Sequence, residues 1–136
     1  MQAAWPVGLM AALTACSAPL APSCASGLGQ PMLVFDLFFG EAIPGRADVT
    51  GAEWMEFVNA TVAANLPEGY TVFDAAGEWT NPRTHRTVKE ATKVLLVALP
   101  DSPASLAAVN SIRTAYQARF HQQLVGMTVE HACGTF

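Results

Sequence analysis

The sequence predicts an α+β domain in which two helices lie against one face of a four-stranded antiparallel sheet. Three observations predict this class. Two segments carry apolar residues at helical spacing, four short segments are rich in branched and aromatic residues, and their order is strand, helix, strand, strand, helix, strand. About 120 residues follow Cys16, which is enough for one domain with a workable core.

The first strand and the first helix have clear sequence boundaries. Residues 33–39 are almost entirely apolar, and Gly40 closes the run. Thr50 and Glu53 then form a capping box, in which the threonine hydroxyl accepts from a free amide of the first turn and the glutamate reaches back. Pro67 ends the helix. Its residues at helical spacing are Trp54, Phe57, Val58, Thr61, Val62 and Leu66.

Two further strands are expected in the middle of the chain. They cover residues 70–75 and a long run over residues 88–99, whose second half is apolar without alternation. Gly77 and the pair Asn81-Pro82 indicate turns between these strands.

The second helix and the last strand complete the order. Ser102 and Pro103 open the helix, since proline suits the first helical position. The last strand is expected from about residue 124 to residue 129. The stripe that the helix should bury consists of Leu106, Val109, Ile112, Tyr116 and Phe120.

This order is that of the ferredoxin-like βαββαβ arrangement, in which the first and third strands lie at the sheet centre and both helices cover one face. A sheet covered on one face should have alternating strands. In both central strands, however, the residues that point to either face of the sheet are apolar. In the first strand, Val34 and Phe38 would point to the open face, away from the helices. We therefore expect a homodimer through that open face, as in dimeric α/β-barrels.

The N-terminus indicates export. An apolar run over residues 7–15 ends in Leu13-Thr14-Ala15-Cys16, the small-residue pattern that precedes the lipidated cysteine of bacterial lipoproteins. The predicted organisation is a signal segment (residues 1–16), a flexible tether (17–31) and the folded domain (32–136). A lipid on Cys16 would tether the protein to a membrane of the bacterial envelope, facing the periplasm or the exterior. The alternatives are ordinary cleavage near Ala21 or Ala25, or an N-terminus that targets nothing.

Composition and motifs exclude several functions. Charged residues make up 13% of the chain and the net charge is −4, so a nucleic-acid partner is not expected. The three histidines lack metal-ligand spacing, and neither a glycine-rich phosphate loop nor a nucleophile elbow is present. We expect neither a metal nor a cofactor.

Several motifs resemble one bacterial family. They are Leu37-Phe38-Phe39-Gly40, then Glu53-Trp54 with Phe57, then residues 69–79 (GYTVFDAAGEW), residues 90–95 (EATKVL) and residues 112–120 (IRTAYQARF). In this order they resemble the family catalogued as domain of unknown function 3574, over residues 33–136. The resemblance implies an exported lipoprotein and brings no known activity. The chain departs from the family in having His121-Gln122-Gln123 where members favour Gly-Gln.

Two cysteines are candidates for a disulfide. In the predicted fold the first and last strands are antiparallel neighbours, with Cys24 before the first and Cys133 at the end of the last. An exported protein meets an oxidising compartment in which a disulfide persists. The alternative is two unrelated free cysteines.

Four polar residues form a candidate ligand pocket. Glu90 and Lys93 share the third strand, whereas Tyr116 and Arg119 are three apart on the second helix. A carboxylate near two cations could bind an anionic or hydroxylated ligand or tune a general acid. The favoured alternative is a network of ion pairs that ties helix to sheet. Asp36, inside an apolar strand, is either paired across a dimer or functional, and the former is favoured.

Two functions remain open. The first is a lipid-anchored envelope protein that binds a small molecule or another envelope protein. The second is a small dimeric α/β-barrel enzyme, similar to monooxygenases that work in a cavity between sheet and helices. The second depends on fold analogy, which is a weak argument for function.

Overall fold

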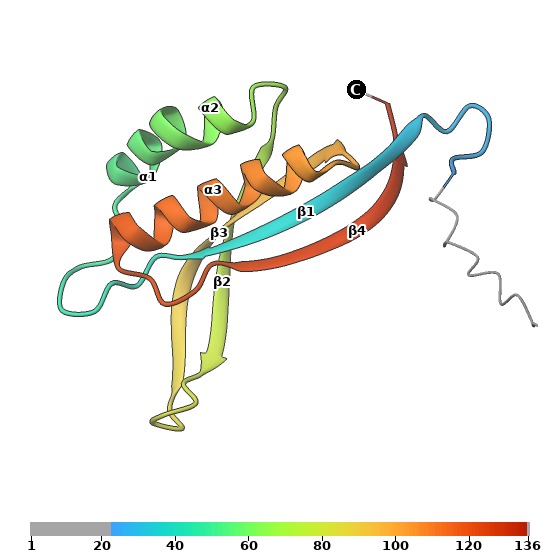
Figure 1. Ribbon diagram of the computed structural model, residues 1–136. Coiled ribbons are helices and arrows are strands. Elements are labelled where there is room, and N and C mark those ends of the chain that lie inside the picture. The colour runs from blue at the N-terminus through green and yellow to red at the C-terminus, as the bar shows by residue number, and fades with distance from the viewer. Residues whose placement is uncertain (1–22, 136) are drawn as a thin grey trace, which may run out of the picture.

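The computed structural model describes residues 23–135, so Cys16 and the signal segment lie outside the described residues. Four antiparallel strands form one sheet in the order β2-β3-β1-β4, and the helices cover one face of it (Figure 1). The strands are β1 (Gln30–Gly40), β2 (Thr71–Thr80), β3 (Thr87–Pro100) and β4 (Gly126–Gly134). The ferredoxin-like prediction is confirmed, with β1 and β3 at the centre.

The first helical segment begins at the predicted capping box. Thr50 Oγ1 accepts from the Glu53 amide at 3.2 Å, and Glu53 Oε2 accepts from the Thr50 amide at 2.9 Å. These bonds, with Arg46 bound to the same carboxylate, lower the pKa of Glu53 to about 2. The segment runs through α1 (Gly51–Phe57), a π-helical turn (Val58–Val62) and α2 (Ala63–Asn65). Sequence periodicity did not predict the π turn.

The second helix, α3 (Pro103–Phe120), begins at Ser102, whose side chain accepts from the Ser105 amide. One position of its predicted stripe is wrong. Leu106 is 43% exposed, and Ser105 is buried in its place because its hydroxyl donates to the Pro100 carbonyl at 2.6 Å. His121 ends the helix in the left-handed conformation (φ 53°), which favours glycine. His121 therefore occupies a backbone position that glycine would adopt without strain.

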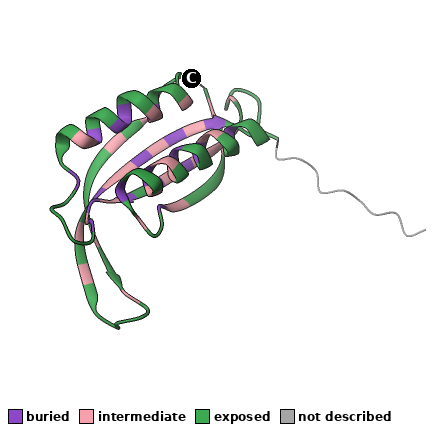
Figure 2. Ribbon diagram, turned by 60° about the vertical axis from the view of Figure 1, so that its left-hand side comes forward, coloured by how far each residue is buried: buried purple, intermediate pink, exposed green. Residues whose placement is uncertain are grey.

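The core lies between the helices and the sheet, as the alternating buried positions along the central strand show in Figure 2. Phe35, Leu37 and Phe39 of β1 are fully buried. Aromatic rings fill the space above Phe39, with ring centroids 4.8 Å apart for Phe39 and Tyr116 and 5.4 Å apart for Phe39 and Trp54. Such edge-on contacts add to the stabilisation from burial. None of the helices in residues 23–135 combines the length and hydropathy that crossing a membrane requires.

The β2–β3 hairpin is longer than the sequence predicts. Pairing of β1 with β3 ends at Gly40 and Thr92, but β2 and β3 remain paired as far as Thr80 and Thr87. We call this two-stranded extension, residues 76–91, the ribbon. The predicted turn at Gly77 is wrong, because Gly77 lies inside β2 opposite Glu90. A Cβ at Gly77 would approach Thr92 Oγ1 to 2.9 Å, so the missing side chain explains the glycine.

Candidate functional site

The four residues of the predicted ligand pocket do not form one site. Glu90 and Lys93 are three apart on a strand, so their side chains leave opposite faces of the sheet. Lys93 and Tyr116 lie on the helix side of the sheet. Lys93 is close to Glu41, and Tyr116 is close to Gly40. Arg119 binds Glu56 of α1 at 2.7 Å instead. The structure therefore brings two of the four together and separates the other two.

Lys93 lies between two carboxylates that the sequence analysis did not single out. Its ammonium group contacts Asp74 of β2 and lies 3.6 Å from Glu41, which is buried in the loop after β1. The hydrogen bond to Asp74 raises the pKa of Lys93, and burial partly opposes this. Asp74 could have been found as a partner of Lys93 from the hairpin register, in which the two residues are opposite each other. Because both carboxylates are engaged by one cation, this cluster ties β2, β3 and the loop together.

Tyr116 is fully buried, and its hydroxyl donates to the Gly40 carbonyl at 3.0 Å. Burial raises the pKa of Tyr116, and the negative charge of Glu41 adds to the effect. The phenol therefore stays protonated and serves as a donor that fixes α3 to the end of β1.

Replacing Tyr116 by phenylalanine is expected to lower the free energy of unfolding by about 1 kcal/mol, because the hydrogen bond is lost while the ring packing is kept. Urea unfolding at fixed protein concentration measures this difference. Tyr70→Phe is the matched control, since Tyr70 is only partly buried beside the core. Equal losses in the two variants would contradict a specific role for the Tyr116 hydroxyl.

Glu90 lies on the face of the sheet opposite the described helices, where two glycines make room for polar side chains. A Cβ at Gly40 would approach the Glu90 carboxylate to 2.7 Å, and a Cβ at Gly77 would crowd Thr92. The two glycines belong to β1 and β2, on either side of β3. They mark the place where the ribbon leaves the four-stranded sheet, and Glu90 is half-buried there.

The same face carries apolar side chains along both central strands. We call the face of the sheet opposite the helices the open face. Phe38 is 40% exposed and Phe73 is 50% exposed. Gly126 of β4 provides room for the Phe38 ring, because a Cβ there would lie 3.3 Å from it. The other apolar residues of the face are Met32, Val34, Val94, Leu96 and Ala98.

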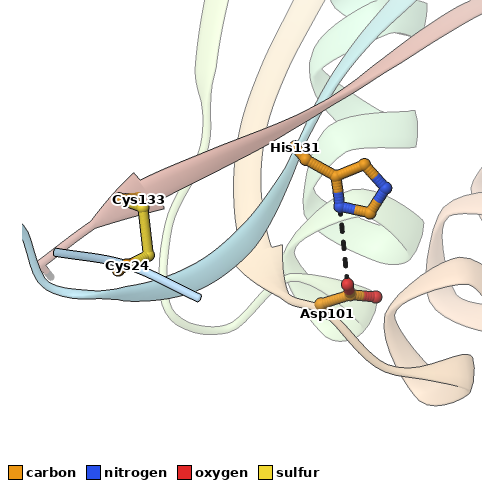
Figure 3. Close-up of a disulfide and its surroundings, with 4 residues drawn as sticks. All are labelled: Cys24, Asp101, His131 and Cys133. Atoms are coloured by element: carbon orange, nitrogen blue, oxygen red, sulfur yellow. Dashed lines mark ion pairs between the residues drawn. A yellow bond between two sulfur atoms is a disulfide. The ribbon is translucent and has the colours of Figure 1, made fainter. Parts of the chain in front are cut away.

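A disulfide joins the segment before β1 to the end of β4, at one end of the sheet. Cys24 and Cys133 are joined, with Cα atoms 5.7 Å apart, which agrees with the prediction from antiparallel strand order (Figure 3). Beside it, His131 Nδ1 lies 3.5 Å from Asp101. A hollow of about 200 Å³ next to the disulfide is lined mainly by apolar atoms of the open face, among them Met32, Val34 and Ala98. Within residues 23–135, no group of three or more His, Cys, Asp or Glu side chains is placed to hold a metal ion.

Comparison with known proteins identifies a family and a fold. Two structures of a phage SAM lyase are similar: one in complex with S-methyl-5'-thioadenosine (14% identity, TM-score 0.60, covering 76% of this chain and 83% of that chain) and one in the apo state (15%, 0.55, 82% and 87%). CutA from Synechococcus elongatus is also similar (10%, 0.49, 76% and 78%). At these identities the likeness to the phage lyase shows the fold alone. No curated protein matches the chain. Residues 35–136 match the family described as protein of unknown function (DUF3574), and the chain belongs to that family.

Proposed function

We propose that this protein is an exported envelope protein, anchored by a lipid on Cys16, that acts as a non-catalytic binding and assembly module and forms a homodimer through its open face. The observation that carries the proposal is the open face itself. Two central strands present apolar side chains on the side of the sheet that none of the helices in residues 23–135 covers. Soluble domains rarely leave so continuous an apolar surface in water.

A second copy is the covering that fits this face best. Each large apolar side chain removed from water contributes about 1.5 to 3 kcal/mol, and a symmetric pair gains this contribution twice. Two copies packed face to face form a closed assembly that leaves neither open face exposed. Leu20 is the one large apolar residue between Cys16 and Cys24, so the tether is a poorer covering.

The packing of the core supports a binding protein over a monooxygenase-like enzyme. Such an enzyme needs a cavity between sheet and helices, whereas here rings of Phe39, Phe57 and Tyr116 occupy that space. Tyr116 and Phe120 continue the cluster with centroids 4.7 Å apart. The hollow beside the disulfide lies on the open face instead, where a partner side chain can enter it.

Self-association in the envelope can be tested with two tags. Full-length copies with different C-terminal tags are produced together in a bacterial host, and one tag is captured from solubilised membranes. We expect the second copy to be captured with the first. The same pair carrying Phe38→Glu is the comparison, and capture of the second copy at equal yield from both pairs would contradict assembly through the open face.

Lipid attachment is expected at Cys16. In cells supplied with a palmitate analogue, the wild-type chain should become labelled and Cys16→Ser should not, because only the thiol of the signal motif accepts the lipid. Cys24→Ser is the control for cysteine substitution and should label normally. Equal labelling of Cys16→Ser and wild type would contradict the proposed anchor.

A further inference from the structure

We propose that the ribbon, residues 76–91, is an arm that clasps the second copy and anchors it through Trp79 and the arginines of its tip. This inference rests on the proposed homodimer and says how the two copies hold each other. It concerns residues outside the main sheet, so it can fail while the homodimer stands.

The ribbon points toward the side that the second copy would occupy. It continues past the end of β1 and bends away from the helices, downward in Figures 1 and 2. The open face and the ribbon together therefore make a corner. Glu90 and Thr92 lie on the inside of this corner, and Gly40 and Gly77 are there because side chains on the concave side are crowded.

The apolar surface follows the corner onto the ribbon. Trp79 is opposite Val88 in the register, on the same parity as Phe73 and Val94 of the open face. Trp79 is 40% exposed although it lies in a two-stranded extension that protects no core. An exposed tryptophan beside an apolar face is the kind of anchor that dominates binding at interfaces.

Charge at the tip complements charge on the open face. Among the seven Lys and Arg residues, all within residues 23–135, five bind carboxylates, a carbonyl or an amide of their own chain. Arg83 and Arg86, in the turn at the ribbon tip, are the two with no such side-chain partner in the described part of the chain. The open face carries carboxylates at Asp36, Glu90 and Glu130.

Two acidic faces brought together would repel each other, and cations from each partner's ribbon offset that repulsion. The geometry therefore points to contacts between the tip arginines of one copy and the open-face carboxylates of the other.

The apolar anchor is tested by truncating Trp79. All variants carry Cys16→Ser, so that no lipid is present, and sedimentation gives the dimer dissociation constant. We expect Trp79→Ala to weaken the dimer by about tenfold or more and Trp79→Phe to weaken it less. Met55→Ala, on the outer surface of α1 and 54% exposed, is the matched control and should leave the dimer unchanged.

The charge complementarity is tested by reversal and rescue. Arg83→Glu/Arg86→Glu should weaken the dimer by about 10- to 100-fold at low salt, and so should Asp36→Lys/Glu130→Lys. In an equimolar mixture of these two double variants, each arm again meets an oppositely charged face, so the heterodimer should form near wild-type affinity.

The outcomes separate this inference from the proposed function. A wild-type dimer that both ribbon variants leave intact overturns the arm and leaves the homodimer standing. If the mixture of the two charge-reversed variants forms no heterodimer, the proposed contact between the tip arginines and the open-face carboxylates is overturned. A wild-type chain that sediments as a monomer overturns the homodimer itself.

Discussion

Removing the disulfide by Cys24→Ser/Cys133→Ser is expected to lower the free energy of unfolding by as much as about 4 to 5 kcal/mol. The bond joins residues 109 apart, so it restricts almost the whole unfolded chain. In the chain-entropy model, loops of this length give the largest stabilisation. Because small domains have only about 5 to 15 kcal/mol of net stability, this loss is large.

The loss is measured by urea unfolding of the oxidised wild type and the double variant at equal protein concentration, since association stabilises the folded state. The melting temperature should fall by more than about 10 °C. Wild type treated with a reducing agent should match the double variant. A difference below about 1 kcal/mol would show that the disulfide adds little to the strand pairing between β1 and β4.

Phe38→Glu is expected to convert the proposed homodimer into a folded monomer. Phe38 lies at the centre of the open face, paired with Val94 on one side and Gly126 on the other. Phe38 is 40% exposed in the single chain, so the variant loses about 40% of the roughly 1.5 to 3 kcal/mol of a full burial in each copy, and it also places a charge in the interface. Since 1.4 kcal/mol is tenfold in affinity, the dissociation constant should rise by at least about 100-fold.

The matched control is Met55→Glu, which makes the same kind of change at an exposed apolar residue on the outer surface of α1. It should remain a dimer. Circular dichroism and unfolding of both variants establish that each is folded. If both variants lose the dimer equally, the effect comes from added charge rather than from the open face.

The sequence predicts the sheet and its order because local signals agree with the global fold. The capping box at Thr50 and Glu53, the proline at the start of α3 and the apolar runs of β1 and β3 each define an element by itself. The part of the ribbon that belongs to β2 was not predicted, because Gly77 was interpreted as a turn. Its glycine makes room for Thr92, which is a requirement of packing between strands that composition does not reveal.

The polar clusters were harder to predict than the fold. Glu90 and Lys93 were expected to share a ligand pocket. Side chains alternate along a strand, however, so residues three apart point to opposite faces of the sheet. The partners of Lys93 and Arg119, namely Glu41, Asp74 and Glu56, lie on other elements and become neighbours only through the tertiary fold. Cys24 and Cys133 were predictable because strand order alone places them together.

Sedimentation equilibrium of the Cys16→Ser chain at micromolar concentration tests whether a second copy covers the open face. We expect a mass twice that of one chain, with dissociation only on strong dilution. A mass equal to that of one chain throughout this range would contradict it.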